Sequence, residues 1–332
     1  MTKEPPKTPA KNLPLDAPTP AVDSDKAYSM VYYGSANRAL SHAHSKNALI
    51  NEAGEAVIKG GDYQVSIKNF RELASSGIIS GLKTSTAQLL CALTQTLTGS
   101  GVRSLRASLH LDDLMSMRGL KDRKETRKQV DGDLKTLSNL RLSFTNRKKG
   151  TEKNYYNMQI FSFTGIKNSI ICVTFGQDYC DILSEYGTMP LSPLVYRVNT
   201  KKYRHAYYFL MALLAHKNIN YTKRNADTIS VKTLLDSSPI FPSYEKVMTE
   251  MNRAVSENII EPFEKNMDAL AEDLSWEFRK AGGEALTDKE RGEMNYALFI
   301  ELMVAVQWKN YPERQDQNKG TPPELLEEKT GG

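Results

Sequence analysis

Apolar residues recur at helical spacing in three successive segments that begin near residue 84. In residues 84–98, leucines three and four positions apart fall on one face, which predicts an amphipathic helix. Residues 109–118 predict a second, shorter helix that Gly119 closes. A third helix is expected to begin at Asp122, which together with Glu125 resembles a capping box.

After this third helix the apolar spacing changes to two, which is typical of β-strands. Residues 142–145 lead into a basic turn at 146–150, and residues 155–164 are expected to return as the partner strand. Residues 169–175 predict one further strand. Three helices followed by a hairpin predict a winged helix, the helix-turn-helix variant with an antiparallel wing.

The same order of elements then follows a second time. Pro262 is expected to kink or divide the longest helix of this second set. The apolar pattern of the final segment is continuous, so it fits a helix as well as a strand. The expected helices span 200–216, 228–236 and 244–270, and the expected hairpin strands span 273–278 and 296–306. The predicted fold class is α+β, mainly helical, with two tandem winged-helix domains that carry β-hairpin wings.

Composition divides the 332-residue chain into five parts. The first 26 residues hold six prolines and almost no large apolar residue, which predicts a disordered arm. The predicted parts are the arm at 1–26, an N-terminal extension packed on the first domain at 27–81, winged-helix domain 1 at 82–195, winged-helix domain 2 at 196–311, and a flexible tail at 312–332.

Positive charge is concentrated in the first of the two domains. The whole chain carries a formal net charge of +5 at pH 7. Residues 82–195 contain 16 Lys and Arg against 10 Asp and Glu, whereas residues 196–311 contain 16 of each. Because a localised basic excess attracts polyanions, we expect the first domain to meet nucleic acid.

The third predicted helix of domain 1 separates apolar side chains from cations. Val130, Leu134 and Leu137 cluster within about 60° on a helical wheel. Most of its cations lie on the far side, and Arg123 falls on the apolar side in the first turn, where the helix end is expected to leave it free. The cations of this segment are Lys121, Arg123, Lys124, Arg127, Lys128 and Lys135.

A cationic helix of this kind fits the major groove of duplex DNA, which is about 12 Å wide. Its side chains can pair with phosphates or reach guanine edges. The alternative is an ordinary solvated face, since several carboxylates interrupt the basic run. We expect further contacts from the hairpin turn and from domain 2, which could equally be a structural or protein-binding module. These candidates are Arg147, Lys148, Lys149, Lys201, Lys202, Lys246, Asn252 and Arg253.

An enzymatic alternative is a rolling-circle relaxase. His42 and His44 have the His-apolar-His form that can hold a divalent metal, and Tyr203 and Tyr207 stand four apart, the spacing of a paired nucleophile. Packing in an apolar helix explains the tyrosines equally well. We therefore expect a non-enzymatic protein that needs no metal or cofactor.

Other classes are not supported by the sequence. No apolar run approaches the ~18 residues of a membrane span, and the N-terminus lacks the apolar core of a secretory signal. No phosphate-cradling glycine loop is present. The three cysteines are expected to be buried free thiols, which fits a reducing cytoplasm.

Six stretches of the chain carry a resemblance to a known family: LKTSTAQLLCALTQTLT, LHLDDLMSMRGL, RKETRKQVDGDLKTLSNLRLSF, YYNMQIFSF with IICVTF, PLVYRVNTKKYRHAYYFLMALLA and YEKVMTEMNRAVSENIIEPFEKNMDAL. Together, over roughly residues 82–311, they resemble plasmid replication initiators (Rep proteins) of the tandem winged-helix type.

The resemblance implies a protein that binds repeated duplex sites at a plasmid origin and starts replication there. It also implies a switch between homodimers, which repress their own gene, and monomers, which open the origin, and recruitment of the host initiator and replicative helicase. A winged-helix transcriptional regulator remains an alternative, because both roles need only site-specific duplex binding. One feature departs from the family pattern: familiar members read DNA mainly with the C-terminal domain, which is neutral here.

Overall fold

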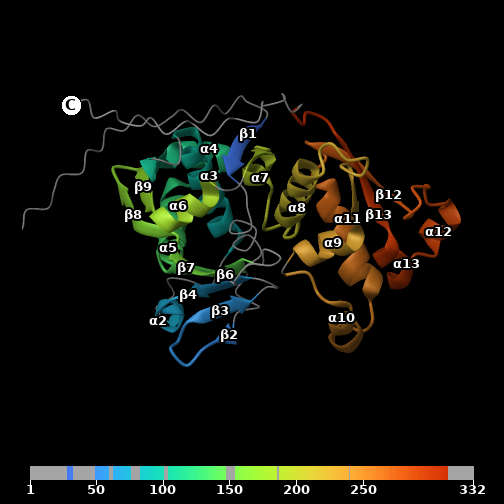
Figure 1. Ribbon diagram of the computed structural model, residues 1–332. Coiled ribbons are helices and arrows are strands. Elements are labelled where there is room, and N and C mark those ends of the chain that lie inside the picture. The colour runs from blue at the N-terminus through green and yellow to red at the C-terminus, as the bar shows by residue number, and fades with distance from the viewer. Residues whose placement is uncertain are drawn as a thin grey trace, which may run out of the picture.

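Within residues 84–175, three helices and a three-stranded antiparallel sheet form the first domain (Figure 1). The computed structural model describes residues 28–32, 49–59, 63–75, 83–100, 104–146, 154–184, 187–238 and 240–312. The elements of this domain are α3 (Thr84–Ser100), β5 (Arg106–His110), α4 (Leu111–Arg118), α5 (Arg123–Ser138), β8 (Phe161–Lys167) and β9 (Ile170–Phe175). The strand order is β5–β9–β8, with β8 and β9 as the wing.

The second domain repeats this arrangement. Its three-stranded sheet has the order β11–β13–β12, and both pairings are antiparallel. Its elements are α8 (Ala206–Ile219), β11 (Thr228–Ser230), α9 (Val231–Ser237), α10 (Tyr244–Glu250), the π-helix η3 (Ser256–Ile260), α11 (Glu261–Asp268), β12 (Leu274–Arg279) and β13 (Met303–Trp308). The chain therefore has the predicted α+β fold of two tandem winged-helix domains. The exact domain boundaries stay a prediction.

The predicted wing of the first domain was assigned to the wrong hairpin. The hairpin with the basic turn belongs to a separate sheet with the order β2–β3–β4–β6–β7. Its turn, residues 147–150, lies outside the described residues. The strands of this sheet are β2 (Leu49–Ile50), β3 (Ala56–Lys59), β4 (Tyr63–Ile67), β6 (Leu140–Asn146) and β7 (Asn154–Gln159).

A bend at Ile160 separates the two hairpins. The predicted strand 155–164 divides there into β7 and β8. Ile160 and Phe161 are both fully buried, although neighbouring residues of a straight strand point to opposite faces. The bend lets the chain leave one sheet and enter the other, and the Ile160 carbonyl accepts a hydrogen bond from the Gly176 amide (2.9 Å).

The predicted long helix 244–270 is interrupted between α10 and η3, and not at Pro262. Asn252 and Arg253 have φ values of 50° and 58°, so two successive left-handed residues end α10. Pro262 lies in the first turn of α11, which follows the π-helix η3 directly, so the helix changes type next to this proline without ending there. Asn252 and Arg253 therefore lie in a turn, and not on the helix where the sequence placed them.

The remaining elements connect or flank the two domains or, between β12 and β13, belong to the second domain. Strand β1 pairs antiparallel with β10, and the open choice for residues 296–306 resolves into a helix followed by a strand. The predicted arm at 1–26 lies outside the described residues, as does the predicted tail beyond residue 312. These remaining elements are β1 (Ser29–Tyr32), α2 (Phe70–Ser75), α6 (Gln177–Ser184), β10 (Thr188–Leu191), α7 (Leu194–Arg197), α12 (Asp288–Gly292) and α13 (Tyr296–Glu301).

Candidate nucleic-acid interface

Helix α5 is the third helix of the first domain, and its start is fixed by Asp122. The Asp122 carboxylate accepts a hydrogen bond from the Glu125 amide (2.9 Å), as an N-cap does. The Thr126 hydroxyl donates to the Asp122 carbonyl (2.6 Å). Farther along, Val130 and Leu137 are fully buried in the core. This buried stripe determines which side of α5 faces solvent.

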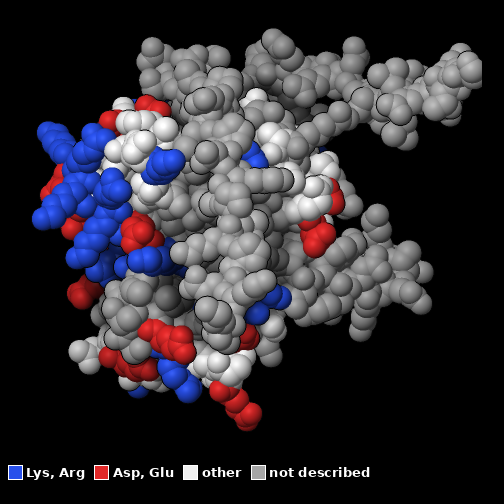
Figure 2. Space-filling model, turned by 90° about the vertical axis from the view of Figure 1, so that its left-hand side faces the viewer, with Lys and Arg blue, Asp and Glu red and all other residues white. Residues whose placement is uncertain are grey.

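The opposite side of α5 carries exposed cations. Figure 2, turned so that the side with α5, β8 and β9 faces the viewer, shows Lys and Arg side chains gathered on part of this face, with carboxylates among them. All six predicted cations of the segment are exposed: Lys121, Arg123, Lys124, Arg127, Lys128 and Lys135.

Two of these six cations are paired with carboxylates. Arg123 forms an ion pair with Asp112 (2.9 Å), and Lys135 forms one with Asp131 (2.7 Å). Among the residues that the structure describes, no carboxylate lies within ion-pair distance of the other four. Within the described part of the chain, Lys124, Arg127 and Lys128 therefore present three unpaired charges on the first turns of α5.

The wing places one further cation that the sequence analysis missed. Lys167 ends β8 and is exposed beside the turn that connects β8 to β9. In the sequence, this turn is indicated by Asn168 and Ser169, which lie between two segments of alternating polar and apolar residues. The predicted turn cations Arg147, Lys148 and Lys149 lie outside the described residues.

The candidates in domain 2 are spread over separate elements. Lys201 and Lys202 are exposed in the turn before α8. Lys246 lies on α10, 3.8 Å from the Glu250 carboxylate. Asn252 and Arg253 are exposed in the left-handed turn that follows. These residues do not share one helix face.

Helix α11 occupies the position in domain 2 that α5 has in domain 1, and it carries the opposite charge. Its single lysine, Lys265, is paired with Glu261 (3.1 Å). Burial raises the pKa of Glu264, and the neighbouring Asp268 and Glu261 raise it further. This surface is unsuited to a phosphate backbone.

Of the residues of the relaxase alternative, the structure describes the two tyrosines. Tyr207 is 1% exposed inside α8, so its hydroxyl is not available to attack a phosphodiester. Tyr203 is half-buried, with Lys202 over its ring. His42 and His44 lie outside the described residues. Within the described part of the chain, no three His, Cys, Asp or Glu side chains gather as a metal site would require.

Cys91, Cys172 and Cys180 are all free thiols, and only Cys180 is fully buried. Burial raises the pKa of Cys91 to about 12, so this thiol stays protonated at neutral pH.

None of the helices in the described ranges has both the length and the apolar character to span a bilayer.

The geometry defines a protein with two winged-helix domains in tandem, one of which exposes a cationic third helix. No protein-family model matches the chain, and no curated protein sequence matches it either. Its structure is similar to that of the Pi initiator protein in complex with iteron DNA, with a TM-score of 0.47 and 11% identity over 69% of this chain and 92% of that chain. It is also similar to domains 2 and 3 of RctB, with a TM-score of 0.42 and 10% identity over 82% of this chain and 100% of that chain.

Proposed function

We propose that this chain is a sequence-specific double-stranded DNA-binding protein that initiates plasmid replication by binding repeated origin sites. The observation that carries DNA binding is the outer face of α5, where Lys124, Arg127 and Lys128 are exposed and have no carboxylate partner among the described residues. The initiator role, repression of its own gene, dimer formation and the host partners rest on the resemblance of the sequence segments to tandem winged-helix Rep proteins.

In the proposed complex, phosphates lie beside the outer face of α5. A helix with one buried apolar face and one exposed cationic face can enter the major groove, where its cations face the DNA backbone on either side. Each Lys or Arg that neutralises a phosphate releases counterions, which gives affinity that falls with salt. The paired cations Arg123 and Lys135 contribute less, because a carboxylate already offsets their charge.

The first prediction concerns salt dependence. Duplexes selected by the protein from a library with about 20 random base pairs, two turns of helix for two domains, serve as the probe. Fluorescence anisotropy should give a slope of about −5 for log K against log salt if about six phosphates are contacted. A response that is flat in salt would contradict DNA binding through phosphates.

The second prediction locates the contacts. The triple variant Lys124→Ala, Arg127→Ala, Lys128→Ala should bind about 100-fold more weakly near 0.15 M salt, with a slope about 3 units shallower, because three phosphate contacts are lost. Its melting temperature should match that of the parent, since these side chains are exposed.

A charge-matched control is Lys223→Ala, Arg224→Ala, Lys232→Ala in domain 2, where all three cations are exposed. This variant should keep the slope of the parent. Equal weakening by both triple variants would show a net-charge effect and would remove α5 from its assigned role.

A further inference from the structure

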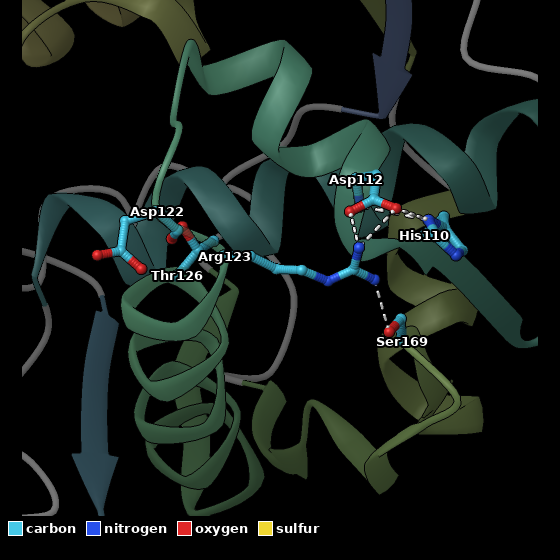
Figure 3. A network of polar contacts seen from close by, with 6 residues as sticks. All are labelled: His110, Asp112, Asp122, Arg123, Thr126 and Ser169. Carbon is cyan, nitrogen blue, oxygen red and sulfur yellow. Dashed lines mark hydrogen bonds and ion pairs between the residues drawn. The ribbon is translucent and has the colours of Figure 1, made fainter.

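Three elements of the first domain meet at the side chain of Arg123 (Figure 3). Its Nη1 forms an ion pair with the Asp112 carboxylate of α4 (2.9 Å), and its Nη2 donates a hydrogen bond to the Ser169 hydroxyl of the wing turn (2.8 Å). Arg123 itself is the first residue of α5. One guanidinium therefore connects α4, α5 and the wing.

The wing turn at this point has an unusual backbone. Lys167 pairs with Ile170, so Asn168 and Ser169 form a two-residue turn, with φ values of 48° and 65°. Two left-handed residues are typical of a type I′ turn, in which Gly is favoured and Ser is not. The turn is anchored by a second contact, because the Ser169 carbonyl accepts a hydrogen bond from the Leu111 amide (2.8 Å).

Asp112 is itself held in place. It lies in the first turn of α4, where the helix dipole favours a carboxylate. The Asp112 amide donates a hydrogen bond to Nδ1 of His110 (3.3 Å), which holds the backbone of this residue at the start of α4. The guanidinium thus meets a fixed acceptor on one side and the wing hydroxyl on the other, which suits its planar fork better than an ammonium group.

We propose that Arg123 is a positioning residue, which fixes the wing turn and its neighbour Lys167 relative to α5 and does not itself bind a phosphate. This inference rests on the proposed function, since it assigns a role within duplex binding. It differs from the sequence-based expectation, in which Arg123 was free at the helix end. Both side chains are exposed, but the charge of Arg123 is paired with Asp112, whereas Lys124 at the next position is unpaired among the described residues.

Asp112→Asn distinguishes a phosphate-binding Arg123 from a positioning Arg123, because the two roles predict opposite changes in duplex affinity. The substitution removes a negative charge next to the interface. If Arg123 bound a phosphate, the loss of its competitor would tighten duplex binding up to about fivefold near 0.15 M salt. If Arg123 positions the wing, binding should weaken by about tenfold, since the wing must then be ordered when DNA binds.

Arg123→Lys and Lys124→Ala complete the comparison. Arg123→Lys keeps the charge, so weakening by about tenfold with an unchanged salt slope supports positioning. Lys124→Ala should instead make the slope shallower by about 0.9, as expected for a lost phosphate contact. Tighter binding by Asp112→Asn, or parent-like binding by Arg123→Lys, would overturn the proposal.

Hydrogen exchange of the DNA-free protein tests the same contact without reference to function. The Leu111 amide, which donates to Ser169, should exchange faster in Asp112→Asn and Arg123→Lys than in the parent, and at the parent rate in Lys124→Ala. Unchanged exchange in the first two variants would refute the proposal. If the parent binds no selected duplex, the proposed function fails, while the exchange rates still decide whether Arg123 holds the wing.

Discussion

Replacing Asp133 with alanine is expected to lower the free energy of unfolding by about 3 kcal/mol. Asp133 lies on the inner side of α5 and is 4% exposed. One of its carboxylate oxygens accepts hydrogen bonds from the hydroxyls of Thr86 (2.6 Å) and Ser85 (3.2 Å), both on α3. Alanine would leave these buried hydroxyls without their acceptor and would remove the carboxylate that offsets the charge of Arg118.

Urea denaturation of the parent and the Asp133→Ala variant measures this loss. A matched control is Asp131→Ala on the same helix, which removes an exposed carboxylate paired with Lys135. The control should change stability by less than about 0.5 kcal/mol, because exposed ion pairs contribute little. Equal stability of the two variants would show that the contacts of Asp133 with α3 do not hold α5 in place.

The same carboxylate gives stability a dependence on pH. Burial raises the pKa of Asp133 above its ordinary value of 3.8, and the Thr86 hydrogen bond and the nearby Arg118 only partly offset this effect. The folded protein therefore binds this proton more tightly than the unfolded chain does. Its stabilising effect is present below pH 3.8 and is lost as the pH rises through the raised pKa.

Comparison with Asp133→Asn isolates this effect, because asparagine does not titrate. The unfolding free energy of the parent minus that of the variant should decrease as pH rises from about 3.5 and become level above the raised pKa. Urea titrations at a series of pH values give this difference. A difference that increases with pH would mean that the hydroxyl hydrogen bonds and Arg118 outweigh burial.

The sequence was sufficient where structure follows from local pattern. The three helices of domain 1 were predicted because apolar side chains at helical spacing must share one buried face. The outer face of α5 followed from the same geometry, and the six cations predicted in residues 121–135 are exposed in the structure. No strand partner has to be known for either conclusion.

The wing could not be predicted in this way, because strand pairing is a choice between distant segments. Apolar and polar residues alternate in the segments around residues 142–159 and 161–175 alike. Only the bend at Ile160 directs the two segments into different sheets. The role of Arg123 was hidden for the same reason. Its partners Asp112 and Ser169 are 11 and 46 positions away along the chain.

Helices α5 and α11, which occupy corresponding positions in the two domains, differ in what they can bind. Helix α5 faces solvent with three cations that have no carboxylate partner in the described ranges, whereas the lysine of α11 is paired with Glu261 and lies among other carboxylates. Like folds thus carry unlike surfaces, since a helix is positioned by its buried side and its outer side is free to vary. This difference agrees with the charge difference between the two domains in the sequence.

The buried side of α11 gives the second large effect. Phe263→Ala is expected to lower the free energy of unfolding by about 3–5 kcal/mol. The Phe263 ring is fully buried, and its centroid lies 5.1 Å from that of Phe209 on α8 and 5.3 Å from that of Phe299 on α13. Truncation would remove these contacts and leave a cavity between three elements that cannot all close on it.

Calorimetry of Phe263→Ala measures the loss, and Phe163→Ala is the matched control. Phe163 lies on β8 and is 49% exposed, so the same truncation there should change stability by less than about 1 kcal/mol. Because α5 belongs to the other domain, Phe263→Ala should keep the salt slope of duplex binding at temperatures well below its transition. A slope that became shallower in this variant would mean that α11 and its neighbours contact phosphates, despite the carboxylates on their surface.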